Sequence, residues 1–155
     1  MSAESVRAWL AEHAADLPIV ETEQSTATVL EAAAALGVEP GRIAKTLAVR
    51  ANGEVFLIVA RGDARLDNGK AKAAFGGRPR MLDAAETLAL TGHPVGGVCP
   101  FGLKTPLRVF LDRSLRDFDE IFPAAGSLNS SVRVTPERLA AVVHGDWVDA
   151  CRIPD

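Results

Sequence analysis

The strongest constraint on how this chain folds is a pair of β-rich runs between residues 43 and 60. Residues 43–50 and 54–60 are rich in β-branched and other apolar side chains, and Asn52-Gly53 stands between them. An Asn-Gly pair suits a tight hairpin turn, because both residues tolerate the positive φ angles that such a turn requires. The sequence therefore predicts an antiparallel β-hairpin here.

Lys45 lies near the start of the first of these strands. Because side chains alternate between the two faces of a strand, Lys45 shares a face with Leu47 and Val49. A lysine on the apolar side of a strand, or at its rim, is in an unusual place for a residue that only improves solubility. Lys45 is therefore a candidate functional residue.

Residues 91–102 form a second unusual segment, with three glycines and one proline between Gly96 and Gly102. This composition disfavours helix and strand alike and predicts an ordered loop. Without a Cβ at Gly96 and Gly97, a ligand could approach the backbone N–H groups closely. Two interpretations remain open: a cradle for a carbonyl or phosphate oxygen, or an ordinary connection from a helix to the next strand.

The remaining segments alternate between helix and strand signals. Helices are expected where an apolar period of three to four residues follows a capping residue, and strands where apolar residues cluster between turns. No repeat or linker divides the chain, so strands and helices in mixed order predict a single α+β domain over residues 1–155. The expected helices are 2–15, 27–36, 67–75, 83–91 and one that opens at Thr135-Pro136-Glu137; the other expected strands are 17–22, 107–112, 118–124 and 132–134, with a polar turn at 126–131.

Composition limits the class of protein. With 155 residues, 48% of them hydrophobic, the chain can bury a core of its own. It has no long apolar run and no basic, apolar N-terminal segment, so we expect a cytoplasmic protein that does not enter membranes. A net charge of −3 argues against non-specific coating of DNA or RNA. Lys70, Lys72, Arg78 and Arg80 form a local basic cluster, which is either a solvated surface or a contact for phosphate.

The histidines and cysteines do not predict a metal centre. His13, His93, His144, Cys99 and Cys151 are scattered and show no spacing typical of a zinc site. The Gly-rich loop lacks the Gly-Lys-Ser/Thr sequence of a nucleotide-binding P-loop.

Cys99 suggests one further kind of chemistry. It could be a nucleophile with His93 as base and Asp112 as the group that orients the base, although a small buried thiol filling space in a tight loop is the alternative.

Three motifs carry a resemblance to a known family. At Lys45-Thr46-Leu47, Gly62-Asp63 and residues 96–102, the chain resembles the YbaK/ProX-type aminoacyl-tRNA deacylases, free-standing relatives of the editing domain inserted in bacterial prolyl-tRNA synthetase. The resemblance covers nearly the whole chain, and the order and spacing of the motifs make it specific. It implies a compact α+β domain with a mixed, mostly antiparallel sheet flanked by helices, which works without a metal or other cofactor.

The resemblance also implies a site. Lys45 corresponds to the family's essential lysine, and Gly96 to Pro100 correspond to a loop whose amides bind the aminoacyl carbonyl. Cys99 and His93 stand where many relatives have serine and tyrosine, which leaves the amino-acid preference open. The implied catalytic residues are Lys45, Gly96, Gly97 and Asp112, and the implied substrate-binding residues are Thr46, His93, Val98, Cys99, Pro100, Gly102, Gly126, Ser127 and Asn129.

The implied function is trans-editing, in which the ester of a mischarged aminoacyl-tRNA is hydrolysed. The expected substrate is a small amino acid on tRNA-Pro or a related tRNA, bound at its 3′ end, with an aminoacyl-tRNA synthetase as a second candidate partner. An aminoacyl ester is already activated, so positioning of the carbonyl and of a water suffices for catalysis. The alternative is a non-catalytic module that binds aminoacyl-tRNA or a synthetase. Intact Lys45 and the Gly96 to Pro100 loop favour the hydrolase.

Overall fold

The structure is a computed structural model that describes residues 2–154. Within them, helices alternate with short and long strands, as the order of signals in the sequence predicts. No helix in this range has the length and apolar character needed to cross a membrane. The α-helices are α1 (Ser2–His13), α2 (Val29–Leu36), α3 (Asn68–Phe75), α4 (Ala84–Thr91) and α5 (Pro136–Val143), and two 3-10 helices are η1 (Pro40–Arg42) and η2 (Arg113–Asp117).

The strands form one large mixed sheet and two small antiparallel pairs. The large sheet has the order β5-β2-β3-β6-β9, with β7 also paired to β2, and the small pairs are β1 with β8 and β4 with β10. This is the α+β architecture that the order of elements in the sequence predicts, with the mixed sheet that the family resemblance implies. The strands are β1 (Ile19–Glu21), β2 (Ile43–Ala51), β3 (Glu54–Arg61), β4 (Arg65–Leu66), β5 (Arg80–Met81), β6 (Val109–Asp112), β7 (Phe122–Pro123), β8 (Ser130–Val132), β9 (Asp146–Val148) and β10 (Cys151–Arg152).

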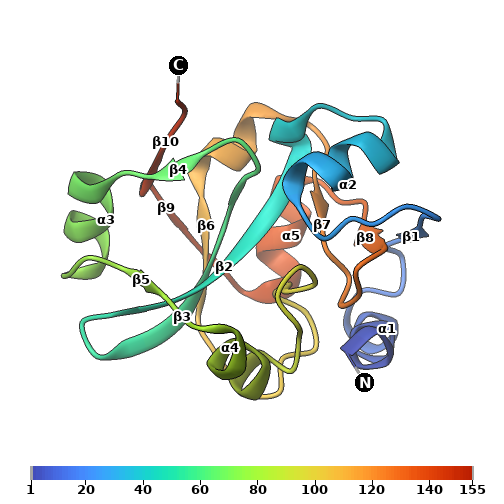
Figure 1. The fold of residues 1–155 in the computed structure, drawn as a ribbon, viewed down its shortest axis with the longest axis horizontal. Coiled ribbons are helices and arrows are strands. Elements are labelled where there is room, and N and C mark those ends of the chain that lie inside the picture. The colour runs from blue at the N-terminus through green and yellow to red at the C-terminus, as the bar shows by residue number, and fades with distance from the viewer. Residues whose placement is uncertain (1, 155) are drawn as a thin grey trace.

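The predicted hairpin is confirmed as the longest ladder of the sheet. Its register runs from Ala44 opposite Arg61 to Ala51 opposite Glu54, which leaves Asn52 and Gly53 as the turn. These two residues have φ angles of 51° and 77°, the positive values that favour an Asn-Gly pair. The hairpin crosses the molecule diagonally, with α3 near its turn (Figure 1).

Capping side chains start four of the helices, as the capping signals in the sequence indicate. Thr28, Asp67, Asp83 and Thr135 each accept a hydrogen bond from the backbone N–H three residues later, at the start of α2, α3, α4 and α5. These bonds satisfy amides that have no partner inside the helix. Local sequence therefore fixes where four helices begin.

Two predicted segments need correction. The strand expected over 118–124 is reduced to β7, because Phe118 follows η2 and its ring lies under the guanidinium groups of Arg42 and Arg61. The polar turn expected over 126–131 ends earlier, because Ser130 and Ser131 belong to β8 and pair with β1. Contacts between segments distant in sequence, which local composition does not show, determine the limits of both segments.

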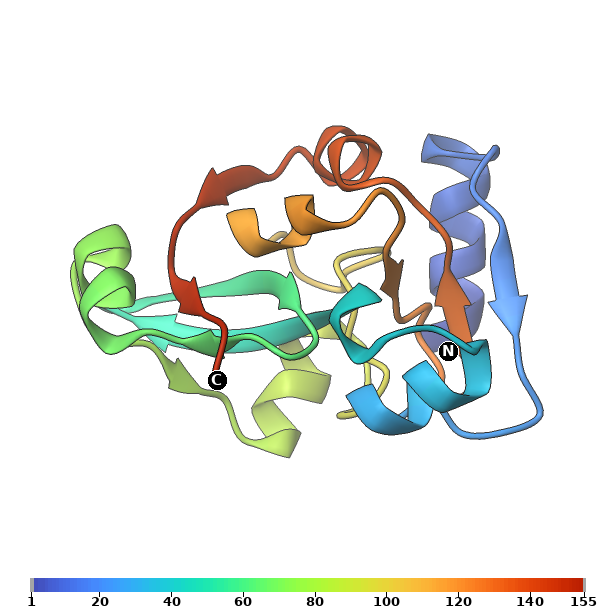
Figure 2. The ribbon, with the colours of Figure 1, turned by 90° about the horizontal axis from the view of Figure 1, so that it is seen from above.

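The sheet has an apolar core on each face. The larger core contains Leu57 and Leu111 of the sheet, Val6 of α1, Leu139 of α5 and Phe101 of the loop between α4 and β6. The smaller core is aromatic, with Phe56 and Phe110 packed against Phe75 of α3. Figure 2 shows the hairpin in the middle of the molecule, with α5 and η2 on one side, α4 on the other and α1 at the end away from α3. The Gly-rich loop is thus part of the main core.

Candidate functional site

A cavity of about 300 Å³ lies beside β2. Its wall comes from five parts of the chain that are far apart in sequence: the stretch that leads into α2 with the start of that helix, the strand β2, the segment from β5 into α4, the Gly-rich loop, and the segment from β7 to β8. The lining residues are Thr26, Ala27, Thr28, Val29, Ala32, Ile43, Ala44, Lys45, Thr46, Leu47, Ala48, Met81, Leu82, Thr87, Val95, Gly96, Val98, Phe122, Ala124 and Ser131.

The cavity lies where one edge of β2 lacks a neighbouring strand. From Ala44 to Ala51 one edge of β2 pairs with β3, and the other edge pairs with β7 at Ile43–Ala44 and with β5 at Val49–Arg50. Within residues 2–154, no strand pairs with residues 45–47 on this second edge. An open edge offers unpaired backbone groups to a ligand.

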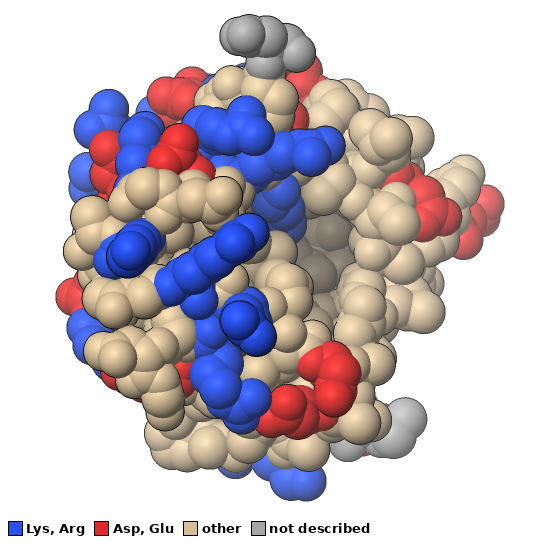
Figure 3. Space-filling view, turned by 60° about the vertical axis from the view of Figure 1, so that its left-hand side comes forward, with Lys and Arg blue, Asp and Glu red and all other residues tan. Residues whose placement is uncertain are grey.

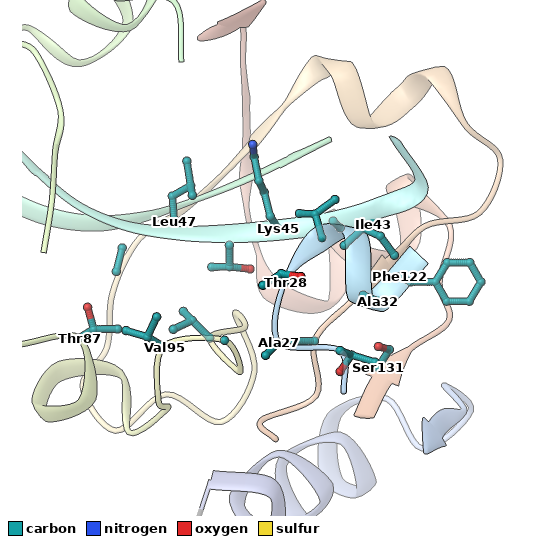
Figure 4. A pocket seen from close by; sticks show the side chains of 18 of the residues that line it. Ala27, Thr28, Ala32, Ile43, Lys45, Leu47, Thr87, Val95, Phe122 and Ser131 are labelled. Atoms are coloured by element: carbon teal, nitrogen blue, oxygen red, sulfur yellow. The ribbon is translucent and has the colours of Figure 1, made fainter. Parts of the chain in front are cut away.

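Lys45 is one of the residues that line this cavity. Figure 4 shows Lys45 and Leu47 extending from one side of β2, while Thr28, Ala27, Val95 and Thr87 lie on the other. The Lys45 ammonium donates a hydrogen bond to the backbone carbonyl of Ala64. Its burial lowers the pKa of Lys45, an effect that the charge of nearby Asp63 partly opposes. A desolvated cation at an open sheet edge is suited to binding an anion.

The side chain of Thr46 lies on the opposite face of β2 from that of Lys45, because neighbouring residues of a strand alternate between its two faces. Its Oγ1 is buried and makes no hydrogen bond within residues 2–154, and the same is true of Thr26 Oγ1 in the facing wall. Both hydroxyls are shielded from the cavity as well as from solvent, so its accessible wall is mostly apolar.

The Gly-rich loop contributes Val95, Gly96 and Val98 to the wall. Gly96 has a φ angle of 93°, which a residue with a Cβ rarely adopts. The neighbouring Gly97 N–H donates to the carbonyl of Pro94 at 2.9 Å. The expectation that Gly97 offers its amide to a ligand therefore needs correction, and Gly96 and Val98 are the loop residues at the cavity.

His93 and Cys99 lie together behind the loop, outside the cavity wall. Both are fully buried. His93 Nδ1 lies 2.6 Å from Ser2 Oγ of α1, and Nε2 lies 2.7 Å from the Phe101 carbonyl and 3.6 Å from Cys99 Sγ. Burial lowers the pKa of His93 and raises the pKa of Cys99 to about 12. Cys99 is therefore a protonated thiol at neutral pH, which is poorly suited to nucleophilic attack.

Asp112 also lies away from the cavity, and its expected place in the wall needs correction. Its carboxylate is 1% exposed and accepts hydrogen bonds from the backbone N–H groups of Ala150, Cys151 and Ser114 at 2.8, 3.1 and 3.0 Å. These bonds join β6 to the start of η2 and to β10. Asp112 thus organises the backbone, and it cannot orient His93.

The turn at residues 126–129 supports the loop from behind. Ser127 Oγ bonds to Asn129 and Ser130, and Asn129 Nδ2 donates to the Thr22 carbonyl. The backbone of Gly126 and Ser127 lies against Gly97, which leaves no free space for a side chain there. Of the residues that the resemblance implies, the structure brings Lys45, Thr46, Gly96 and Val98 to the cavity. It places Gly97, His93, Cys99, Pro100, Gly102, Asp112, Gly126, Ser127 and Asn129 elsewhere.

Sequence reasoning missed several lining residues, of which Thr26, Ser131 and Leu82 are examples. Thr26 and Thr28 both precede α2 and both fit a capping role, but only Thr28 caps the helix. The burial of Thr26, at 6% exposure, follows from its backbone bond to Leu128 at 2.6 Å. Such a long-range contact has no signal in the local sequence.

Basic side chains gather next to a hollow in the surface (Figure 3). This face carries α3 with Lys70 and Lys72, together with β4, β5 and β10. Arg65 of β4 stands directly opposite Arg152 of β10, and the charge of Arg65 contributes to the lowered pKa of Lys45. Like charges directly opposite each other destabilise a strand pair unless an anion binds them.

Comparisons with known proteins cover most of the chain. The family model described as "Aminoacyl-tRNA editing domain" matches residues 23–142. YwhH of Bacillus subtilis (strain 168), an uncharacterized protein, is 46% identical over 154 residues, or 98% of each chain. EbsC of Enterococcus faecalis, provisionally named a Cys-tRNA(Pro)/Cys-tRNA(Cys) deacylase, is 31% identical over 120 residues, 76% of this chain and 73% of EbsC. A crystal structure provisionally described as a trans-editing enzyme for prolyl tRNA synthetase is 36% identical, with a TM-score of 0.89 over 97% of each chain.

Proposed function

Because the chain belongs to the aminoacyl-tRNA editing-domain family, we propose that it hydrolyses the ester that joins a small amino acid to the 3′ end of a mischarged tRNA, tRNA-Pro or a related one. The observation that carries this proposal is the cavity at the open edge of β2, which lies between Lys45 and the loop residues Gly96 and Val98. Such a site can hold a short acyl group at one end and a nucleotide at the other.

The proposed chemistry needs positioned backbone amides and a water. The N–H groups of Gly96 and Val98 donate to the aminoacyl carbonyl oxygen and stabilise the negative charge that develops on it. A water oxygen attacks the carbonyl carbon, the bond to the ribose oxygen breaks, and the ribose hydroxyl leaves with a proton. We propose that the free hydroxyl of the same ribose orients the water. No enzyme nucleophile is required, in keeping with the raised pKa of Cys99.

Lys45 holds the other end of the substrate in this proposal. Its ammonium lies on the opposite side of β2 from the loop, so the substrate crosses the unpaired edge at residues 45–47. The terminal phosphate lies with Lys45 and the aminoacyl group lies in the cavity. An ammonium binds a phosphate as a point charge, and desolvation strengthens the attraction.

The basic face next to Lys45 is suited to the phosphates of the acceptor stem. Arg152→Gln should weaken binding of uncharged tRNA a few-fold and reduce the slope of log K against log salt by about one, because one phosphate contact is lost. Fluorescence anisotropy at several salt concentrations measures both. Arg138→Gln is a matched control, since it removes the same charge from α5, where Arg138 pairs with Asp16 at 2.8 Å. An equal loss in both variants would contradict a defined role for this face.

A second candidate is a binding module without turnover. The observation that favours it is that the lining residues include no His, Asp or Glu, so Lys45 is the one titratable side chain in the wall, and its ammonium is bonded to the Ala64 carbonyl. In that case the protein would sequester aminoacyl-tRNA or attach to a synthetase.

Deacylation assays separate the two candidates. tRNA-Pro charged with alanine, serine, cysteine or proline is incubated with the protein, and loss of the ester is followed against the uncatalysed rate. The hydrolase predicts acceleration for at least one small amino acid, and little for proline on its own tRNA. Tight binding without acceleration of any of the four would favour the module.

A further inference from the structure

The Lys45 ammonium is bonded to a turn that also carries a carboxylate. It donates to the carbonyl of Ala64, which ends the turn of residues 61–64 between β3 and β4. The Ala64 N–H closes this turn by donating to the Arg61 carbonyl at 2.9 Å, and Ala64 is fully buried. Asp63 is the residue before Ala64. An acidic side chain therefore stands next to the group that holds the lysine.

Backbone packing fixes the position of this turn. A Cβ at Gly62 would clash with the Pro40 carbonyl oxygen and would lie 3.0 Å from the Ile43 carbonyl oxygen. The turn thus lies directly against η1 and the start of β2. Because the backbone cannot move away, the direction of the Asp63 side chain decides how close its charge comes to Lys45.

Arg61 determines that direction. Its Nε and Nη2 donate to the two carboxylate oxygens of Asp63 at 2.6 and 2.8 Å, and its Nη1 donates to Asp117 of η2 at 2.8 Å. The guanidinium also lies over the Phe118 ring, 5.2 Å from its centroid. The Arg61 side chain is 18% exposed, so these bonds hold Asp63 more firmly than a solvated surface pair would.

The result is a lysine with a free charge beside an acid. Burial lowers the pKa of Lys45, and the negative charge of nearby Asp63 partly opposes this effect. Within residues 2–154, however, the ammonium forms no ion pair, because both Asp63 oxygens are bonded to Arg61. An ammonium has three N–H donors, and the Ala64 carbonyl takes one of them. The others are free for an anion.

We propose that Arg61 is a positioning residue for Lys45: by holding the Asp63 carboxylate, it prevents Asp63 from pairing with the ammonium and leaves the ammonium free to bind a phosphate. A carboxylate paired with Lys45 would compete with that phosphate for the same N–H donors. The inference rests on the proposed function, because the phosphate in question is the one that Lys45 holds there.

The test measures how much a substrate phosphate contributes to the reaction. Hydrolysis rates at low substrate concentration are compared for 3′-O-alanyl-AMP and 3′-O-alanyl-adenosine, which differ only in the 5′-phosphate. The wild-type protein should hydrolyse the AMP ester at least about tenfold faster, the scale of one charge-assisted hydrogen bond. Arg61→Met releases Asp63 and should bring this ratio of rates toward one.

A second substitution separates this role from a structural one. The double variant Arg61→Met/Asp63→Asn removes the released carboxylate, so the ratio of rates should return most of the way to the wild-type value. An ion pair that only stabilises the fold predicts a different result. Its loss would slow both esters equally and would leave the ratio unchanged in the single and the double variant.

Arg42→Met is the matched control. Arg42 lies over the same Phe118 ring, 5.0 Å from its centroid, and pairs with Asp119 at 2.8 Å. This variant therefore loses a ring contact and an ion pair of the same kind without releasing Asp63. The melting temperature should fall in both single variants, whereas the ratio of rates should fall only in Arg61→Met. Should Arg61→Met not fold, Arg61→Gln tests the same prediction, since its uncharged amide cannot hold both carboxylate oxygens.

The other outcomes are decisive as well. If the wild type hydrolyses both esters at similar rates, or if Arg61→Met keeps the wild-type ratio, the inference is overturned. It is also overturned if the added Asp63→Asn change restores nothing, or if Arg42→Met lowers the ratio as much as Arg61→Met does.

If the wild type hydrolyses neither ester, the proposed function fails, and binding decides the inference. The alanyl amides of 3′-amino-3′-deoxyadenosine, with and without a 5′-phosphate, are then titrated by calorimetry into the same proteins. A preference for the phosphorylated amide that falls in Arg61→Met and returns in the double variant supports the inference. Equal or absent binding of the two amides to the wild type overturns it.

Discussion

The cavity wall and the buried cluster around His93 both contain polar groups, but the groups in the two regions differ in whether they have hydrogen-bond partners. Behind the loop, His93 has partners on both ring nitrogens, in Ser2 and in the Phe101 carbonyl. In the cavity wall, the hydroxyls of Thr26 and Thr46 have none. Polar groups that bond to one another hold the fold together, whereas the two buried hydroxyls without partners lower its stability.

Lys45→Ala should have the largest effect, because it removes the cation from the side of the site proposed to bind phosphate. We expect deacylation to fall at least about a hundredfold, the scale of losing one strong electrostatic contact in an active site. The lost bond to the Ala64 carbonyl should change stability by only about 1 kcal/mol, so the variant should fold. Single-turnover rates and thermal melts measure the two effects.

Lys104→Ala is the control for this change, since Lys104 is exposed and does not line the cavity. Near-wild-type turnover in Lys45→Ala with a normal melt would remove Lys45 from the mechanism.

Gly97→Ala tests whether the loop must stay where its supporting turn holds it. An added Cβ would lie 3.2 to 3.3 Å from the backbone of Gly126 and Ser127, so the loop would shift by a few tenths of an ångström. The amides of Gly96 and Val98 would shift with it. We expect turnover to fall roughly ten- to a hundredfold, because a displaced oxyanion donor loses most of its effect.

Gly69→Ala in α3 provides the comparison, since its Cβ would meet only Asp67 Oδ1 at 3.5 Å. Full activity in Gly97→Ala would show that the exact position of the loop does not matter for catalysis.

The sequence predicts the parts of this molecule that local chemistry determines. The Asn52-Gly53 turn and the helix caps at Thr28 and Asp83 follow from neighbouring residues, and the structure confirms them. Two-residue strands such as β5 and β10 have no recognisable alternation, so they could not be predicted.

The residues in and around the candidate site also fall into those that the local sequence identifies and those that only the folded chain brings together. Lys45 was recognisable because a charge interrupts an apolar strand face. The role of Asp112 depends on the backbone of Ala150 and Cys151, which approach it only in the folded chain. Thr26 and Ser131 enter the cavity wall through contacts of the same long-range kind.

Cys99→Ser should have a small effect on activity, since the cluster behind the loop has a structural role. The thiol is fully buried, and its pKa of about 12 keeps it protonated. We expect turnover within about tenfold of the wild type, and no alkylation of the folded protein by iodoacetamide at pH 8. A loss of about a thousandfold, the scale of removing a covalent nucleophile, would instead support a thiol mechanism.

The smallest effect concerns the pH dependence that His93 gives to stability. A carbonyl only accepts, so Nε2 carries the proton that is donated to Phe101, and Nδ1 accepts from the Ser2 hydroxyl. Burial lowers the pKa of His93 in the folded protein below its ordinary value of about 6.5. As the pH falls through that value, the unfolded chain binds a proton that the folded chain does not, so the neutral histidine stabilises the fold above about pH 6.5 and less below it.

The variant His93→Gln lacks this titration. Its melting temperature should therefore fall short of the wild-type value by less at pH 5.5 than at pH 7.5. The deficit should narrow by a few degrees at most, since about 1 kcal/mol corresponds to 2–4 °C in a domain of this size. A deficit that stays constant or widens over this range would show that His93 takes up its proton as readily in the folded chain as in the unfolded one, and the contrast between a closed polar cluster and an open cavity wall would not hold for this residue.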